Sequence, residues 1–80
     1  MPGKDDVFAV VKKNIIEILP EVKPEAISPE KSLTELGANS VDRMEVVTLS
    51  MEDLGLKIPL MSFAGVTNIG GLVSVLFENV

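Results

Sequence analysis

The sequence contains no cysteine and no histidine, and only three of its 80 residues are aromatic. Without cysteine there are no disulfides and no thiolate catalysis, and without histidine the commonest general base and metal ligand is missing. Most hydrolytic, redox and zinc chemistry is therefore not expected, and we predict neither catalytic nor metal-binding residues. A small domain without disulfides also fits a reducing cytoplasm.

Basic residues are scarce: the sequence has 12 acidic and 7 basic residues, which gives a net charge of −5. Nucleic acids and anionic membranes require basic surface, so neither is expected as a partner. The N-terminus lacks the basic and then apolar layout of a signal peptide. An uncharged stretch, Ile58 to Phe77, is long enough to span a bilayer, but Pro59, Gly65 and Gly70 interrupt it like turns and caps. We predict a soluble, cytoplasmic and monomeric chain.

The length and the apolar pattern predict one domain, residues 1–80, with a single aliphatic core. Apolar residues spaced by three and four predict a first helix over Asp5–Leu19. Asp5 or Asp6 is expected to cap its start, and Pro20 to end it.

A long loop, Pro20–Asn39, follows the predicted first helix. Loops of this length in small domains are usually functional or held by their own anchors. The run Ser32–Glu35 fits a capping box around a single helical turn, which Gly37 would close. The expected anchors into the core are Ile27, Leu33 and Leu36.

The remaining elements are also helical, since no segment alternates as a strand. A second helix is predicted over Ser40–Leu54, with Asn39 or Ser40 as its cap and Gly55 as its stop. A short helix is expected over Leu60–Ala64. The last helix should have Thr67 or Asn68 as its cap and run to Phe77 or beyond. Gly70 and Gly71 in its first turn suggest close packing against a neighbour. The predicted buried stripe of this helix is Ile69, Leu72, Val73 and Leu76.

The predicted second helix is apolar on more than one face. Val46, Val47 and Leu54 should point into the core, whereas Val41, Met44 and Met51 form a second strip that starts beside Ser40. One interpretation is a central helix buried on several sides. The other is an exposed apolar strip with an acidic border, which is typical of a protein docking site. The bordering residues are Asp42, Glu45, Glu52 and Asp53.

Ser40 by itself would be read as a helix cap. The run Leu33-Thr-Glu-Leu-Gly-Ala-Asn-Ser-Val-Asp-Arg-Met-Glu, however, resembles the signature of the acyl carrier protein family. The Leu-x-Ile-Pro turn and the Thr-Asn-Ile-Gly-Gly-Leu opening of the last helix extend this resemblance over the whole chain. It implies an all-α bundle of three main helices and one short helix, with a long first loop. It also implies that a phosphopantetheinyl transferase attaches phosphopantetheine from coenzyme A to Ser40, and that the chain is not an enzyme.

Two departures from the common family pattern suggest a subgroup: Asn39 stands where Asp is usual, and Val41 where Leu is usual. Together with Arg43, they make the chain similar to the free-standing carriers of polyketide β-branching. The resemblance implies an acetyl donor to a synthase of the hydroxymethylglutaryl (HMG-CoA-synthase-like) type. An acyltransferase would load malonyl, and a decarboxylating ketosynthase would convert it to acetyl. A generic carrier for chain extension and an unmodified helical interaction module are the alternatives.

The partner-docking surface implied by this reading surrounds Ser40. Arg43 could pair with an acidic residue of the partner, because no residue three or four positions away from it is acidic. The predicted docking residues are Asn39, Val41, Asp42, Arg43, Met44, Glu45, Thr48 and Met51.

Overall fold

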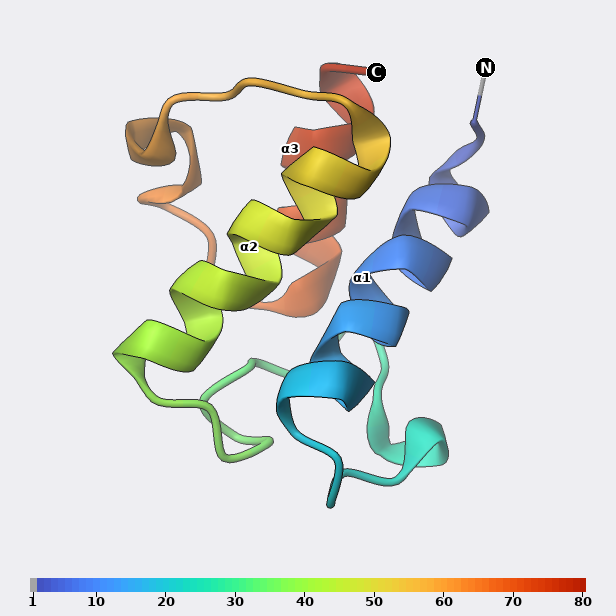
Figure 1. Ribbon diagram of the computed structural model, residues 1–80, viewed down its shortest axis with the longest axis vertical. Coiled ribbons are helices and arrows are strands. Elements are labelled where there is room, and N and C mark those ends of the chain that lie inside the picture. Colours follow the sequence, from blue (N-terminus) through green and yellow to red (C-terminus); the bar gives the residue numbers. More distant parts are fainter. Residues whose placement is uncertain (1) are drawn as a thin grey trace.

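The computed structural model describes residues 2–80, which form three α-helices and two short 3-10 helices, with no strand in that part of the chain. The α-helices are α1 (Lys4–Ile18), α2 (Ser40–Leu54) and α3 (Ile69–Glu78) (Figure 1). The 3-10 helices are η1 (Pro24–Ala26) and η2 (Leu60–Phe63). The predicted bundle of three main helices and one short helix is confirmed. The short helix is η2, whereas η1 was not predicted.

The start of α1 differs from the prediction. Gly3 occupies the cap position, so the expectation that Asp5 or Asp6 caps the helix is wrong. Asp6 instead reaches back from the first turn, and its carboxylate accepts the Gly3 N–H at 2.8 Å. An acidic side chain therefore still accepts a hydrogen bond from a backbone N–H at the helix start, but it comes from the first turn of the helix and not from the cap position. The other end lies where Pro20 requires it, because the helix stops at Ile18 and Leu19 follows as the C-cap.

The core is aliphatic, as predicted, and every α-helix contributes to it. α1 places Val7, Val11 and Ile15 in the interior, and α2 contributes Val46. The loop between them adds Ile27, which is buried as expected. α3 supplies the predicted stripe of Ile69, Leu72, Val73 and Leu76, all of them buried.

The loop from residue 20 to residue 39 is fixed by its own contacts. Leu33 and Leu36 pack half-buried against the core, which confirms them as anchors. The predicted capping box also exists: Ser32 N–H donates to the Glu35 carboxylate, and Glu35 N–H to the Ser32 hydroxyl, each at 3.0 Å. Gly37 has a φ of +99°, a backbone conformation that favours glycine. Residues 33–37 form hydrogen-bonded turns instead of a helix.

The same loop is attached to the start of α3 through the backbone. The amide of Gly70 donates to the carbonyl of Pro29 at 2.8 Å, and the amide of Ile69 to the carbonyl of Lys31 at 2.9 Å. A Cβ atom on Gly70 would lie 3.2 Å from both Cβ and the carbonyl oxygen of Pro29. The close packing predicted from this glycine is therefore confirmed, and residues 29–31 of the loop are held against the start of α3.

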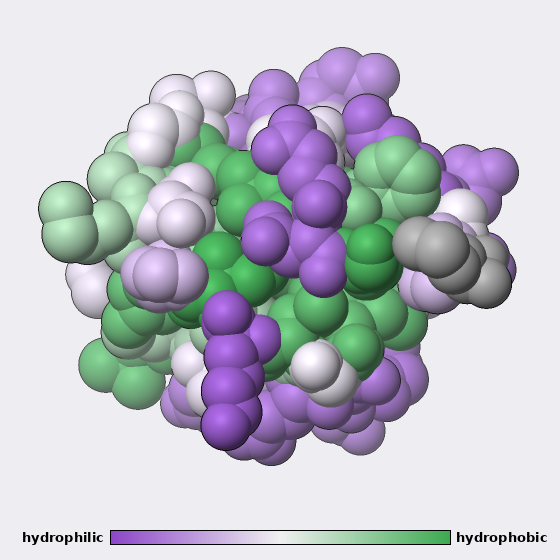
Figure 2. Space-filling model, turned by 90° about the horizontal axis from the view of Figure 1, so that it is seen from above, coloured by the Kyte–Doolittle hydropathy of each residue, from purple (hydrophilic) through white to green (hydrophobic). Residues whose placement is uncertain are grey.

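Figure 1 shows that α1 begins and α3 ends at one end of the molecule, while α2 begins at the other. Seen from the former end, apolar surface is exposed between polar side chains (Figure 2). Part of the exposed apolar surface belongs to η2, where Met61 is 87% exposed. The uncharged stretch 58–77 is divided between η2, a loop and α3. Within residues 2–80 no helix has the length and apolarity needed to cross a membrane.

Candidate functional site

Ser40 is the first residue of α2, and its side chain is exposed. The cap of this helix is Asn39, whose Oδ1 accepts the Asp42 N–H at 2.8 Å. Asp42 reciprocates, because its carboxylate accepts the Asn39 N–H at 3.1 Å. This pair fixes the first turn and leaves the Ser40 hydroxyl outside the capping network. Gly55 ends the helix with a φ of +68°, as the sequence predicted.

Among the described residues, 2–80, no side chain around Ser40 is arranged to activate it as a nucleophile. Within residues 2–80, the side-chain hydrogen bond to Ser40 Oγ comes from Arg43 Nη2 at 3.3 Å. A guanidinium only donates and cannot take up the hydroxyl proton. The carboxylate of Asp42 already accepts a hydrogen bond from the backbone N–H of Asn39. The geometry thus suits a hydroxyl to which a separate enzyme attaches a group.

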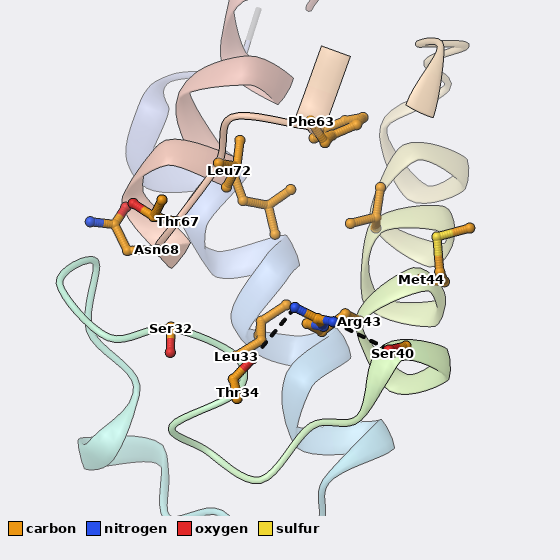
Figure 3. Close-up of a pocket in the computed structure, with 12 residues that line it drawn as sticks. Ser32, Leu33, Thr34, Ser40, Arg43, Met44, Phe63, Thr67, Asn68 and Leu72 are labelled. Carbon is orange, nitrogen blue, oxygen red and sulfur yellow. Dashed lines mark hydrogen bonds between the residues drawn. The ribbon is translucent and has the colours of Figure 1, made fainter. Parts of the chain in front are cut away.

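The side chain of Arg43 extends from α2 toward the preceding loop (Figure 3). Besides its contact with Ser40, its Nη1 donates to the Thr34 hydroxyl at 3.5 Å. Thr34 was not among the predicted site residues. Its position in the signature run was the available signal, but the run alone does not show that a loop residue meets the side chain of Arg43.

A groove of about 330 Å³ opens beside Ser40. The loop, α2, η2 and the start of α3 enclose it, and its apolar lining includes Leu33, Met44, Phe63 and Leu72 (Figure 3). Thr34, Ser40 and Arg43 line it as well. Sequence reasoning missed this groove, since it forms between elements that are distant in the chain.

The predicted docking residues divide into two groups along α2. Around its first turns, Val41 is 64% and Met44 47% exposed. Met51 differs, because it packs half-buried against the core. One side of α2 is thus buried, and the end near Ser40 presents exposed apolar side chains; whether partners dock there stays a prediction. Asp42 is the half-buried member of the first group. Its exposed members are Asn39, Val41, Arg43, Met44 and Glu45. The second group, Thr48 and Met51, lines a separate hollow near Pro59.

The site can be tested for its fit to a phosphopantetheine arm. Such an arm is joined to serine through a phosphodiester, so it requires an accessible hydroxyl in surroundings that tolerate negative charge. Ser40 is exposed, and its hydroxyl accepts a hydrogen bond from the cationic side chain of Arg43. The backbone N–H groups of the first helical turn add positive potential. These residues fit the arm.

Comparison with known proteins agrees with this geometry. The family described as "Phosphopantetheine attachment site" matches residues 9–76. The chain is 49% identical to the polyketide biosynthesis acyl-carrier-protein AcpK of Bacillus subtilis (strain 168) over 77 residues. The aligned residues cover 96% of this chain and 94% of that relative.

A solved structure, the curacin biosynthetic pathway HMG synthase in complex with acetyl donor-ACP, contains a chain of very similar fold. The TM-score is 0.89 with 38% sequence identity, over 98% of this chain and 100% of the other. Proteins of the matched family carry a covalent phosphopantetheine group and hold acyl groups for other enzymes, without being catalysts themselves. The chain belongs to the acyl carrier proteins.

Proposed function

We propose that Ser40 bears the phosphopantetheine arm, and that this carrier donates acetyl to an HMG-CoA-synthase-like enzyme in polyketide β-branching. The observation that carries the proposal is the exposed Ser40 hydroxyl at the first residue of α2, flanked by Asn39, Val41 and Arg43. The similarity to AcpK supports a role in polyketide biosynthesis. The similarity to a chain from a complex between HMG synthase and acetyl donor-ACP supports the donor role.

The chain's own residues present the arm and do not transform its cargo. When bound, phosphopantetheine supplies a thiol that holds acyl groups as thioesters. Ser40 Oγ is the attachment atom, and the reciprocal bonds between Asn39 and Asp42 fix the turn that presents it. Earlier in the same loop, the carbonyls of Pro29 and Lys31 accept the amides of Gly70 and Ile69, which holds that part of the loop against the start of α3. Partners thus meet the arm at a fixed place on the molecule.

The docking surface that we propose is the exposed part of α2 next to Ser40. Val41 and Met44 provide apolar contact, and the flexible thioether of Met44 can pack against differently shaped partners. Glu45 and Asp42 give the surface an acidic border, which a basic patch on a partner would complement. Thr48 and Met51, which line the separate hollow near Pro59, would add contacts farther along the helix. The partners would be the transferase, the malonyl-loading acyltransferase, the decarboxylating ketosynthase and the synthase.

The attachment site is tested by incubating the chain with a phosphopantetheinyl transferase and coenzyme A. Intact mass should show one added arm on the unmodified sequence and none on Ser40→Ala, because the only attachment atom is lost. Ser62→Ala removes another exposed hydroxyl, on η2, and should still accept one arm. Arm addition to Ser40→Ala would contradict the site assignment.

The donor role is tested by offering the acetylated carrier to a β-branching synthase and to a fatty-acid ketosynthase. Acetyl transfer to the first is expected. Transfer to the ketosynthase alone would favour the generic carrier for chain extension. An absence of the arm in protein isolated from its native host, shown by intact mass, would favour the unmodified interaction module.

A further inference from the structure

The side chain of Arg43 reaches from α2 across the edge of the groove, toward the loop that precedes the helix (Figure 3). Its two terminal nitrogens donate to the hydroxyls of Ser40 and Thr34 at 3.3 and 3.5 Å. Both distances lie beyond the usual range for N–H···O bonds, and both acceptors are neutral. A guanidinium forms shorter and stronger bonds with anionic oxygens, often two at once. The contacts seen here therefore leave most of its binding capacity unused.

Arg43 has no carboxylate partner among residues 2–80. The ion pair in that part of the chain joins Lys13 to Asp53, at 3.0 Å. Asp42, next to Arg43 in sequence, directs its carboxylate to the backbone N–H of Asn39. A guanidinium without a carboxylate partner thus lies 3.3 Å from the atom that would bear a phosphodiester.

We infer that Arg43 is a positioning residue for the arm: its guanidinium pairs with the phosphodiester on Ser40 while Thr34 holds its other nitrogen. This inference rests on the proposed function. The non-bridging oxygens of a phosphodiester are only two bonds from Ser40 Oγ, so rotation about the ester bonds brings one of them to Nη2. Because Arg43 lines the groove, the pairing turns the start of the arm toward the groove and away from Val41.

The pairing also has an electrostatic reason. The chain already carries a net charge of −5, and Asp42 and Glu45 are close to Ser40 in sequence. A phosphodiester adds one more negative charge to this end of α2. Arg43 offsets that charge inside the chain, so it would not be available to an acidic residue of a partner. The role predicted for it from sequence, a contact with the partner, is the competing hypothesis.

The test compares the arm-free and arm-bearing forms of four proteins: the unmodified sequence, Arg43→Gln, Arg43→Lys and Lys57→Gln. Lys57 is an exposed cation beyond the other end of α2 and serves as the matched control. The ³¹P resonance of the arm reports the surroundings of the phosphodiester. The thermal midpoint of each form shows whether Arg43 contributes more once the arm is present.

Arg43→Gln should shift the ³¹P resonance and lower the midpoint of the arm-bearing form by about 1–5 °C more than that of the arm-free form, as expected for an exposed ion pair. This extra loss should disappear at high salt, where the pair is screened. Arg43→Lys keeps the charge and should retain part of the difference. Lys57→Gln should change both forms equally and leave the ³¹P resonance in place.

An unchanged ³¹P resonance in Arg43→Gln, or equal midpoint losses in its two forms, would overturn the inference. Weaker binding of this variant to the synthase with an unchanged resonance would overturn it in favour of a contact with the partner. A chain that accepts no arm at all would instead overturn the proposed function. An arm on Ser40 that is insensitive to Arg43 overturns this inference alone.

Discussion

Asn14 lies at the contact between α1 and α2, with only 1% of its surface exposed. Its side-chain amide donates to the hydroxyl of Ser50 at 3.1 Å and to the carboxylate of Asp53 at 3.0 Å. Ser50 is fully buried as well. No fully buried side-chain nitrogen or oxygen in residues 2–80 lacks a partner. Because an unpaired buried polar group is unfavourable, these bonds fix how α2 lies against α1.

Replacing Asn14 by leucine, whose side chain branches at the same atom, should lower the free energy of unfolding by about 1–3 kcal/mol, because the Ser50 hydroxyl loses its buried donor. Urea unfolding followed by circular dichroism measures the loss. The double variant Asn14→Leu with Ser50→Ala should lose less than the two single variants together, since both polar partners are then gone. Additive losses would show that the two side chains do not depend on each other.

At the scale of the helices, Asp53 connects α1 and α2. The hydrogen bond from Asn14 and the ion pair with Lys13 lower the pKa of this carboxyl below its ordinary value of 3.8. A group whose pKa is lower in the folded state stabilises the fold above its unfolded pKa. That contribution is lost as the pH falls through the lower folded pKa. Acid below pH 3.8 should therefore weaken the attachment of α2 to α1.

This pH dependence is testable by measuring unfolding at pH 6 and again at pH 3. The unmodified protein should lose more stability between the two than Asp53→Asn, which has no carboxyl left to protonate. Glu25→Gln, which alters a carboxylate in η1, serves as the control and should behave like the unmodified protein. An equal acid-induced loss in Asp53→Asn would mean that the ion pair and the hydrogen bond contribute nothing at this interface.

The attachment of the loop to α3 gives a prediction at the same scale. Replacing glycine by alanine inside a helix usually stabilises it by about 1 kcal/mol. At position 70, however, the new methyl group would meet the Pro29 backbone, which is itself hydrogen-bonded there. Gly70→Ala should therefore lower the thermal midpoint. Gly65→Ala adds its methyl group in open space and is the control; a raised midpoint in Gly70→Ala would contradict the close packing.

Local signals predicted the elements well, and contacts between elements explain the errors. The bounds of α2 follow from Asn39 and Gly55, which act on their own neighbours, so they were predictable. The three residues of η1 are too few to show a helical period, and the cap at Gly3 has no side chain to mark it. Asn14 reads as a surface residue until α2 is packed against it. The Arg43–Thr34 contact likewise needs the folded loop.

At the scale of the whole molecule, charge and exposed apolar surface together define how partners approach. The proposed docking surface predicts that Met44→Glu slows acetyl transfer about 5–30-fold, which corresponds to about 1–2 kcal/mol for one apolar anchor. Steady-state transfer to the synthase measures this effect. Phe77→Glu changes an exposed apolar residue near the end of α3 and should transfer normally. A loss of helical signal in Met44→Glu would show instead that Met44 supports the fold.

The arrangement of the helices in Figure 1 puts the start of α1 and the end of α3 at one end of the molecule and Ser40 at the other. A fluorophore, an affinity tag or a solid support joined at either of those two helix ends would thus be held away from the modified hydroxyl. Carriers immobilised this way would all present Ser40 outward, in one orientation. Enzymes passing over such a surface could load and unload the arms without meeting the support.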